Sequence, residues 1–242
     1  MNSKLKALLT TTAGAALAAG MVLASQGSAQ ANIQLTIDVG GTSNTYTDGG
    51  TGSITLSPTT IDGVVITGES ATQTIGFNNI LTSGASSIIN TNAFAVTVHA
   101  AVSANNFAGP AYSVDLSGSG TWILNQGNSI TQNWYDDTTN TLGATTATDT
   151  PGALVGTFSN TAGAGTTSWS FNPGLTPLAT PDTGLFSESE GWTYVLAAGA
   201  ELTSRGQDIL KTQAIVTTPE PASLALLGVG LTTLGLVRRR RS

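Results

Sequence analysis

The sequence contains no cysteine and a single histidine, and only 9% of its 242 residues are charged. Without cysteine the chain has no disulfide framework, no thiolate metal site and no thiol nucleophile. The one histidine, His99, excludes a metal site built from several imidazoles, and any Ser-His-Asp triad would have to use it. No G-x-S-x-G nucleophile motif accompanies it. The composition therefore predicts a protein that is no enzyme and needs no cofactor or metal.

Positive charge is almost missing from the middle of the chain. Only Arg205 and Lys211, of the eight Lys and Arg residues, lie between residues 32 and 217, a range that also holds 13 acidic residues. The formal charge of this range is therefore −11. A surface that follows a phosphate backbone needs clustered cations, so the composition argues against a nucleic-acid partner.

The first 31 residues have the pattern of a signal peptide. Lys4 and Lys6 form a positive n-region, residues 7–24 are small and apolar, and Ala29 and Ala31 fit the A-x-A cleavage pattern. Export through the Sec machinery and cleavage by signal peptidase would leave a mature chain that begins near residue 32. A retained signal anchor is the alternative.

The last residues combine a proline motif, an apolar segment and an arginine cluster. Pro219, Glu220 and Pro221 favour an extended backbone, and residues 222–237 carry no charge. As a helix these roughly 16 residues would span about 24 Å, somewhat less than a hydrocarbon core of about 30 Å. Arginine flanks are retained on the cytoplasmic side, so we expect a transmembrane helix with its carboxyl end inside. The retaining residues are Arg238, Arg239, Arg240 and Arg241.

This arrangement over residues 218–242 resembles the PEP-CTERM sorting signal of Gram-negative bacteria. Thr218 departs from the pattern, because a valine often precedes the motif in the family. The resemblance implies cleavage near Pro219, Glu220 and Pro221 by an integral-membrane exosortase, whose own cysteine supplies the catalysis. The region has also been labelled the C-terminal domain of ice-binding proteins, a label that would describe the anchor only. A plain tail anchor with a proline-containing linker is the alternative.

A period of two dominates the region between the signals. In residues 33–39 and 94–103, apolar residues alternate with polar ones, as in half-buried strands, and the second of these should be central. Residues 121–134 suggest a hairpin, and residues 204–211 are the best candidate for one or two helical turns. Further short strands are expected at 53–56, 64–66, 74–78, 112–116, 154–158, 169–171, 192–201 and 214–217.

Short strands separated by Gly, Pro, Asn and Asp predict an all-β fold, a jelly-roll-like β-sandwich over residues 32–217. A β-solenoid is the runner-up, although no fixed-period repeat supports it. The chain is then divided into a signal peptide (1–31), a Thr-, Ser- and Gly-rich sandwich (32–217) and a sorting signal (218–242).

Three polar groups could carry chemistry, and each has a simpler interpretation. His99 falls on the polar face of its strand and is expected to be solvated. Asp136 and Asp137, with Asn140, could offer oxygen ligands to calcium, but their spacing matches no calcium loop, so a solvated turn is favoured. Glu188 and Glu190 invite a paired-carboxylate glycosidase interpretation, but they are expected to face solvent.

Aromatic and hydroxyl side chains leave two binding alternatives. Tryptophan rings exposed on one face would bind sugars, but all four alternate with small polar residues and are expected in the core. Threonines at 72 and 74 or at 139 and 141 have the alternation of an ice-binding ladder, but lack its repetition. The four tryptophans are Trp122, Trp134, Trp169 and Trp192.

Together these patterns predict an exported, exosortase-processed structural protein of the cell surface or exopolysaccharide matrix. It would be anchored transiently in the inner membrane before processing. Exosortase, signal peptidase and the Sec machinery are its expected partners, with exopolysaccharide as a further candidate. A glycan-binding or adhesion module is the alternative, followed by ice binding and then by a glycoside-active enzyme.

Overall fold

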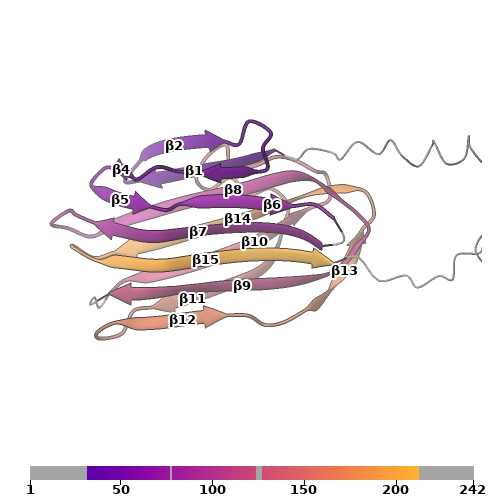
Figure 1. The fold of residues 1–242 in the computed structure, drawn as a ribbon. Helices are drawn as coiled ribbons and strands as arrows, with labels where there is room; N and C mark the ends of the chain where they lie inside the picture. Colours follow the sequence, from indigo (N-terminus) through magenta and orange to yellow (C-terminus); the bar gives the residue numbers. More distant parts are fainter. Residues whose placement is uncertain (1–31, 77, 124–126, 213–242) are drawn as a thin grey trace, which may run out of the picture.

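The computed structural model describes residues 32–76, 78–123 and 127–212, which form β-strands joined by turns and loops (Figure 1). No helix among these residues is long and apolar enough to cross a membrane. The predicted signal peptide, the transmembrane helix and the strand at 214–217 lie outside this range. The strands are β1 (Ile33–Val39), β2 (Thr42–Thr47), β3 (Ser53–Thr55), β4 (Thr59–Ile61), β5 (Val64–Thr67), β6 (Ser70–Thr74), β7 (Asn78–Asn90), β8 (Val96–Ala108), β9 (Ala111–Ile123), β10 (Ser129–Asp137), β11 (Ala153–Thr161), β12 (Thr167–Phe171), β13 (Thr176–Asp182), β14 (Leu185–Leu196) and β15 (Glu201–Thr212).

The strands form two antiparallel sheets that pack face to face (Figure 1). The six-stranded sheet has the order β11-β10-β14-β8-β1-β2, and the nine-stranded sheet follows the path β12-β9-β15-β7-β5-β4. Strand β13 pairs with β9, while β6 pairs with β7 and β3. The all-β prediction is confirmed, and the β-solenoid alternative does not describe these sheets.

Eight strands of this pair of sheets have the neighbour order of a jelly roll, in which consecutive strands change layer except at β10 and β11. Strands β7, β15, β9 and β12 are neighbours in one sheet, and β8, β14, β10 and β11 are neighbours in the other. This order places two Greek keys back to back. The N-terminal strands extend both sheets along one side: β1 and β2 beside β8, and β3 to β6 beside β7.

The period of two has the expected cause, because alternate residues of the central strands enter the space between the sheets. In β8, Val98, Ala100 and Val102 are buried, and the strand is central, with β1 and β14 on its two sides. The predicted start of this strand is wrong, since β8 begins at Val96 and Phe94 is 65% exposed. The expected strand at 74–78 is also wrong, because β6 ends at Thr74 and β7 begins at Asn78.

The predicted hairpin over residues 121–134 is wrong. Strand β9 lies in the nine-stranded sheet and β10 in the six-stranded sheet, so the connection between them crosses from one layer to the other. Gly118 and Gly120, just before Trp122, lie inside β9. A Cβ at Gly118 would collide with Gln132, and one at Gly120 would collide with Trp169. Gly118 therefore permits close packing between the layers, and Gly120 makes room for the Trp169 ring of the neighbouring strand β12.

The predicted helical turns at 204–211 are also wrong, because these residues belong to β15. Arg205, Gln207, Ile209 and Lys211 are all buried, and the residues between them are not. The strand period was hidden in the sequence because three of its four inward residues are polar. The strand predicted at 154–158 is confirmed within β11, and that at 169–171 within β12.

Candidate functional site

All four tryptophans lie in the core, as predicted. Trp122 and Trp134 have no exposed surface, Trp192 is 3% exposed and Trp169 is 8% exposed. The ring of Trp134 stacks on Phe171 with 5.4 Å between the ring centroids. The tryptophans therefore form no exposed platform for sugar rings.

A loop over residues 138–152 lies across the outer face of the six-stranded sheet. The Thr36 hydroxyl donates a hydrogen bond to the Ala144 carbonyl at 2.6 Å, and the Gly143 amide donates to the Ser103 hydroxyl at 2.9 Å. Both contacts join the loop to strands distant in the sequence. The loop is thus fastened to the middle of the sheet rather than only to its own ends.

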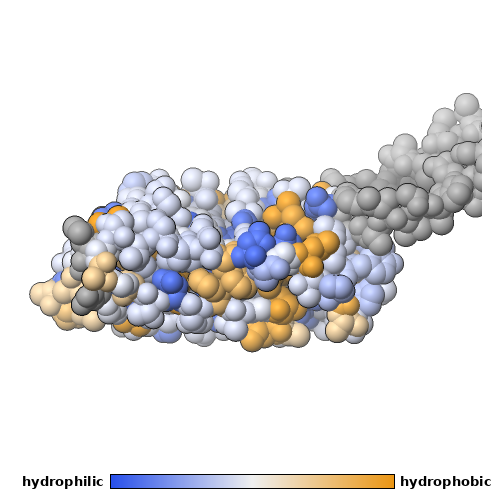
Figure 2. Space-filling view, turned by 90° about the horizontal axis from the view of Figure 1, so that it is seen from below, coloured by the Kyte–Doolittle hydropathy of each residue, from blue (hydrophilic) through white to orange (hydrophobic). Residues whose placement is uncertain are grey.

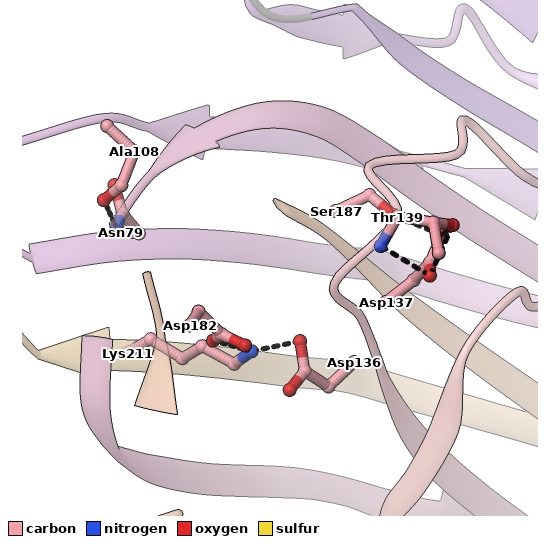
Figure 3. A network of polar contacts seen from close by, with 8 residues as sticks. All are labelled: Asn79, Ala108, Asp136, Asp137, Thr139, Asp182, Ser187 and Lys211. Atoms are coloured by element: carbon pink, nitrogen blue, oxygen red, sulfur yellow. Dashed lines mark hydrogen bonds and ion pairs between the residues drawn. The ribbon is translucent and has the colours of Figure 1, made fainter. Parts of the chain in front are cut away.

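Asp137 holds the start of this loop (Figure 3). Its carboxylate accepts hydrogen bonds from the Thr139 amide at 2.9 Å, the Thr139 hydroxyl at 2.7 Å and the Thr141 amide at 2.9 Å. Burial alone would raise the pKa of Asp137, but the bonds from Thr139 and Thr141 lower it overall. The predicted solvated turn is therefore wrong, since Asp137 is 6% exposed.

Between the loop and the sheet lies a hollow of about 100 Å³. Gly191 lines it, and a Cβ on this residue would lie 3.2 Å from the Thr150 methyl carbon. Glycine therefore keeps the hollow open. The polar residues that line it are Asn133, Tyr135, Thr148, Thr150 and Thr193.

His99 lies on the same outer face, as its position on the polar side of the strand predicted. Its Nδ1 is 3.0 Å from the Thr193 hydroxyl, which also lines the hollow. The imidazole is half-buried rather than fully solvated. The outer face thus offers hydroxyl, amide, phenol and imidazole groups, which donate and accept hydrogen bonds.

Glu188 and Glu190 do not face solvent, so that prediction is wrong. Both are fully buried in β14, on the face that also carries Trp192 and Tyr194. The alternation of residues 186–196 could have shown this, because even positions that include Trp192, Tyr194 and Leu196 must share one face of the strand. The two carboxyls are enclosed between the sheets.

One buried cluster centres on Arg205. Its guanidinium forms an ion pair with Glu69 at 2.9 Å and donates a hydrogen bond to the Ser83 hydroxyl at 3.2 Å. Ser83 in turn donates to Glu190 at 2.7 Å. Burial raises the pKa of Glu69 to about 7, although Arg205 opposes this rise. Burial also raises the pKa of Glu190 well above its usual value.

A second buried cluster centres on Lys211, near the end of β15 (Figure 3). The Lys211 ammonium forms ion pairs with Asp136 of β10 and with Asp182 of β13, the latter at 2.7 Å. Glu188 of β14 lies directly opposite Asp136 in the register of the β10–β14 strand pair. Sequence reasoning missed this cluster because its four members lie on four strands that only the sheet topology brings together.

No group of three or more His, Cys, Asp or Glu residues in the described ranges is arranged to hold a metal ion. Asp136 bonds inward to Lys211, while Asp137 bonds to the loop on the outer face. The two carboxylates therefore point apart, as expected for adjacent residues of a strand. They do not form the calcium site considered from the sequence.

Residues 217–241 match the PEP-CTERM protein-sorting motif. The motif implies export, membrane anchoring before processing and an exosortase as the processing partner. Its predicted functional residues Pro219, Glu220, Pro221 and the four terminal arginines lie outside the described residues, as do Ala29 and Ala31 of the predicted signal peptide.

A comparison with curated proteins found no match. Among solved structures, the chain is similar to infectious bursal disease virus, Gx strain, at 14% identity and a TM-score of 0.35, covering 77% of this chain and 52% of that one. It is also similar to TmCBM61 in complex with beta-1,4-galactotriose, at 12% identity and a TM-score of 0.31, covering 66% of this chain and 86% of that one. A third is the family 11 carbohydrate-binding module from Clostridium thermocellum in complex with a beta-1,3-1,4-mixed-linked tetrasaccharide. Its identity is 10% and its TM-score 0.24, and the match covers 67% of this chain and 96% of that one. None of these TM-scores reaches 0.5, so no property of these proteins is transferred to this chain.

Proposed function

We propose that this chain is a structural protein of the cell surface or exopolysaccharide matrix, exported, processed by an exosortase and without catalytic activity of its own. The sorting motif at 217–241, which follows closely on β15, carries this proposal. The burial of Glu188 and Glu190 supports it, because a glycosidase needs its carboxyls in contact with substrate.

The surface chemistry of the sandwich suits a matrix of uncharged polymers. Arg205 and Lys211 are the only lysine or arginine residues in the described ranges, and both are buried. The surface seen in Figure 2 is largely pale, with hydrophobic groups interspersed among weakly polar residues. With its positive charges enclosed and an excess of acidic residues, the domain would repel polyanions. The proposed polysaccharide is therefore neutral.

A second candidate function is binding of a defined glycan at the hollow beneath the 138–152 loop. Its amide, phenol and threonine hydroxyls are the groups that exchange hydrogen bonds with sugar hydroxyls. The volume of about 100 Å³ is small beside the roughly 300–1,000 Å³ of ordinary ligand pockets. Such a site would take one hydroxymethyl group or one edge of a sugar ring from a longer chain.

Fractionation and intact mass of the native protein, with and without its exosortase, test the main proposal. A product that begins near residue 32, ends near Pro219 and is found outside the inner membrane is expected in wild-type cells. Retention of the four terminal arginines in both strains would contradict exosortase processing. It would leave a plain membrane-anchored protein.

Electrophoresis through native gels that contain the cell's purified exopolysaccharide tests the glycan-binding candidate. Retardation relative to a gel without polysaccharide is expected, and added free polysaccharide should reverse it. Equal migration in both gels, for protein shown to be folded, would rule out binding of that polysaccharide.

A further inference from the structure

Lys211 has an environment that is unusual for a lysine. Its side chain has no exposed surface, and its ammonium contacts Asp136 and Asp182, which come from different strands. The ring of Phe186 lies 4.4 Å from the nitrogen and stacks on Phe107 at 5.6 Å. An amine without exposed surface is thus held against two carboxyls and one aromatic ring.

Glu188 is the fourth residue of the cluster, and no ion pair accounts for its burial. It is fully buried, and neither of its carboxyl oxygens has a hydrogen-bond partner among the described residues. It lies directly across from Asp136 in the β10–β14 pairing, and both residues face the interior. Opposite residues in such a pair have Cβ atoms about 4.5–5.5 Å apart. Glu188 is therefore placed to exchange protons with the Lys211–Asp136 pair.

Three carboxyls surround one cation, so this cluster cannot be neutral unless protons are bound. Burial raises the pKa of Glu188 well above its usual value, and burial also raises that of Asp136. Protonated carboxyls are thus favoured beside the amine. A neutral carboxyl is the form that an amine attacks, because a carboxylate repels a nucleophile and cannot release a hydroxyl group as water.

We propose that Lys211 and Asp136 form an intramolecular isopeptide bond, with Glu188 transferring the protons. The uncharged Lys211 nitrogen attacks the Asp136 carboxyl carbon, a C–N bond forms and a C–O bond breaks. The hydroxyl leaves as water with a proton from Glu188, and a proton from the nitrogen returns to Glu188. One ammonium and one carboxylate become one amide and one water, so no oxidant, reductant or metal is required.

The position of the pair gives the bond a structural purpose. Asp136 belongs to the six-stranded sheet and Lys211 to the nine-stranded sheet, so the amide would join the two layers covalently. It also replaces a buried ion pair, whose desolvation is costly, by a neutral group. Lys211 is close in sequence to the sorting motif that begins at residue 217. The bond would tie the strand next to the anchor into the body of the domain.

Asp136 is assigned as the partner because a bond to Asp182 would not link the two sheets. Asp182 lies on β13, which pairs with β9 in the same sheet as Lys211. A bond to it would join an edge strand to its own layer. We assign Asp182 to hydrogen bonding of the Lys211 amine before reaction.

Intact mass spectrometry of the purified full chain under denaturing conditions tests the bond. Its termini are first determined by peptide mapping, so that processing at either end does not confuse the result. We expect a mass lower than that of the observed sequence by one water molecule. Pepsin digestion should yield a branched peptide that joins the segments containing Lys211 and Asp136. A mass equal to the linear sequence would overturn the proposal.

Variants separate the roles within the cluster. Lys211→Arg and Asp136→Ala should restore the full linear mass, whereas Asp182→Ala should keep the loss of water. Glu188→Gln preserves the shape of the side chain but not its proton, and should slow bond formation after refolding by about 100-fold or more. A branched peptide at Asp182 would overturn the assignment to Asp136. Formation at the wild-type rate in Glu188→Gln would overturn the role of Glu188.

Discussion

The guanidinium of Arg205 lies 4.2 Å from the centroid of the Trp192 ring, in the interior between the two sheets. Arg205 comes from β15 and Trp192 from β14, so this cation–π contact joins the two layers. The arginine is also the only cation beside Glu69 and Glu190 in the described residues. The interior of this sandwich therefore depends on charges as well as on apolar packing.

Replacement of Arg205 is expected to destabilise the fold strongly. Arg205→Met would leave Glu69 buried without its partner and remove the contact with Trp192, at a cost of about 3–5 kcal/mol in the free energy of unfolding. Urea unfolding followed by tryptophan fluorescence measures this loss. Thr97→Ser, at an exposed position of β8, is the control and should change stability by less than about 0.5 kcal/mol. Equal stability of the two variants would contradict the structural role of the cluster.

Stability is expected to fall as the pH rises through neutrality. The pKa of Glu69 is raised from 4.5 to about 7, so the stability that its bound proton contributes is complete below about pH 4.5 and lost as the pH passes 7. At about 1.36 kcal/mol per pKa unit, the loss from Glu69 is on the order of 3 kcal/mol. Glu188 and Glu190, whose pKa values are also raised by burial, act in the same direction.

Urea unfolding at a series of pH values between about 5 and 8 measures this dependence. Glu190→Gln should make the slope shallower, because it removes one buried group that must release a proton. A stability that stays constant across this interval would show that these carboxyls are already ionised in the folded protein.

Loss of the Asp137 carboxylate is expected to release the 138–152 loop. Asp137→Ala removes the acceptor for the Thr139 and Thr141 amides, which are then left to water. Hydrogen exchange should become faster at these amides and along the loop, while protection in β8 is unchanged. Because the pKa of Asp137 is lowered, its contribution should also disappear as the pH falls through that lowered value. Uniformly faster exchange throughout the domain would indicate global destabilisation instead.

Filling the hollow is expected to block glycan binding at this face. Gly191→Val would place side-chain atoms against Thr150, because even a lone Cβ at position 191 would lie 3.2 Å from the Thr150 methyl carbon. Retardation in polysaccharide gels should be lost, and a cooperative unfolding transition should show that the variant is still folded. Gly184→Ala is the matched control, because a Cβ there meets nothing within 4 Å. Unchanged retardation in Gly191→Val would place any polysaccharide contact elsewhere.

The alternation of apolar and polar residues predicted strands correctly where the buried residues are also the hydrophobic ones. The strands at 33–39 and 169–171 were predicted because apolar and polar residues alternate there, and the core positions of the tryptophans followed from the same alternation. Pattern failed at β15, where Arg205, Gln207 and Lys211 face inward. A strand with a polar inner face has no hydrophobic period, so its sequence resembled one or two helical turns.

The sequence by itself determined the all-β class, the buried tryptophans and the sorting motif at 217–241, because each depends on residues that are close together in the chain. Only the tertiary structure decided that Lys211, Asp136, Asp182 and Glu188 meet, since they lie on four different strands. It also reversed the expectation for Glu188 and Glu190, which lie inside the sandwich. Glu190 accepts a hydrogen bond there from Ser83 of the opposite sheet, and the charge of Lys211, also of that sheet, partly offsets the burial of Glu188. Such compensation depends on strand pairing and layer packing, which a local pattern does not specify.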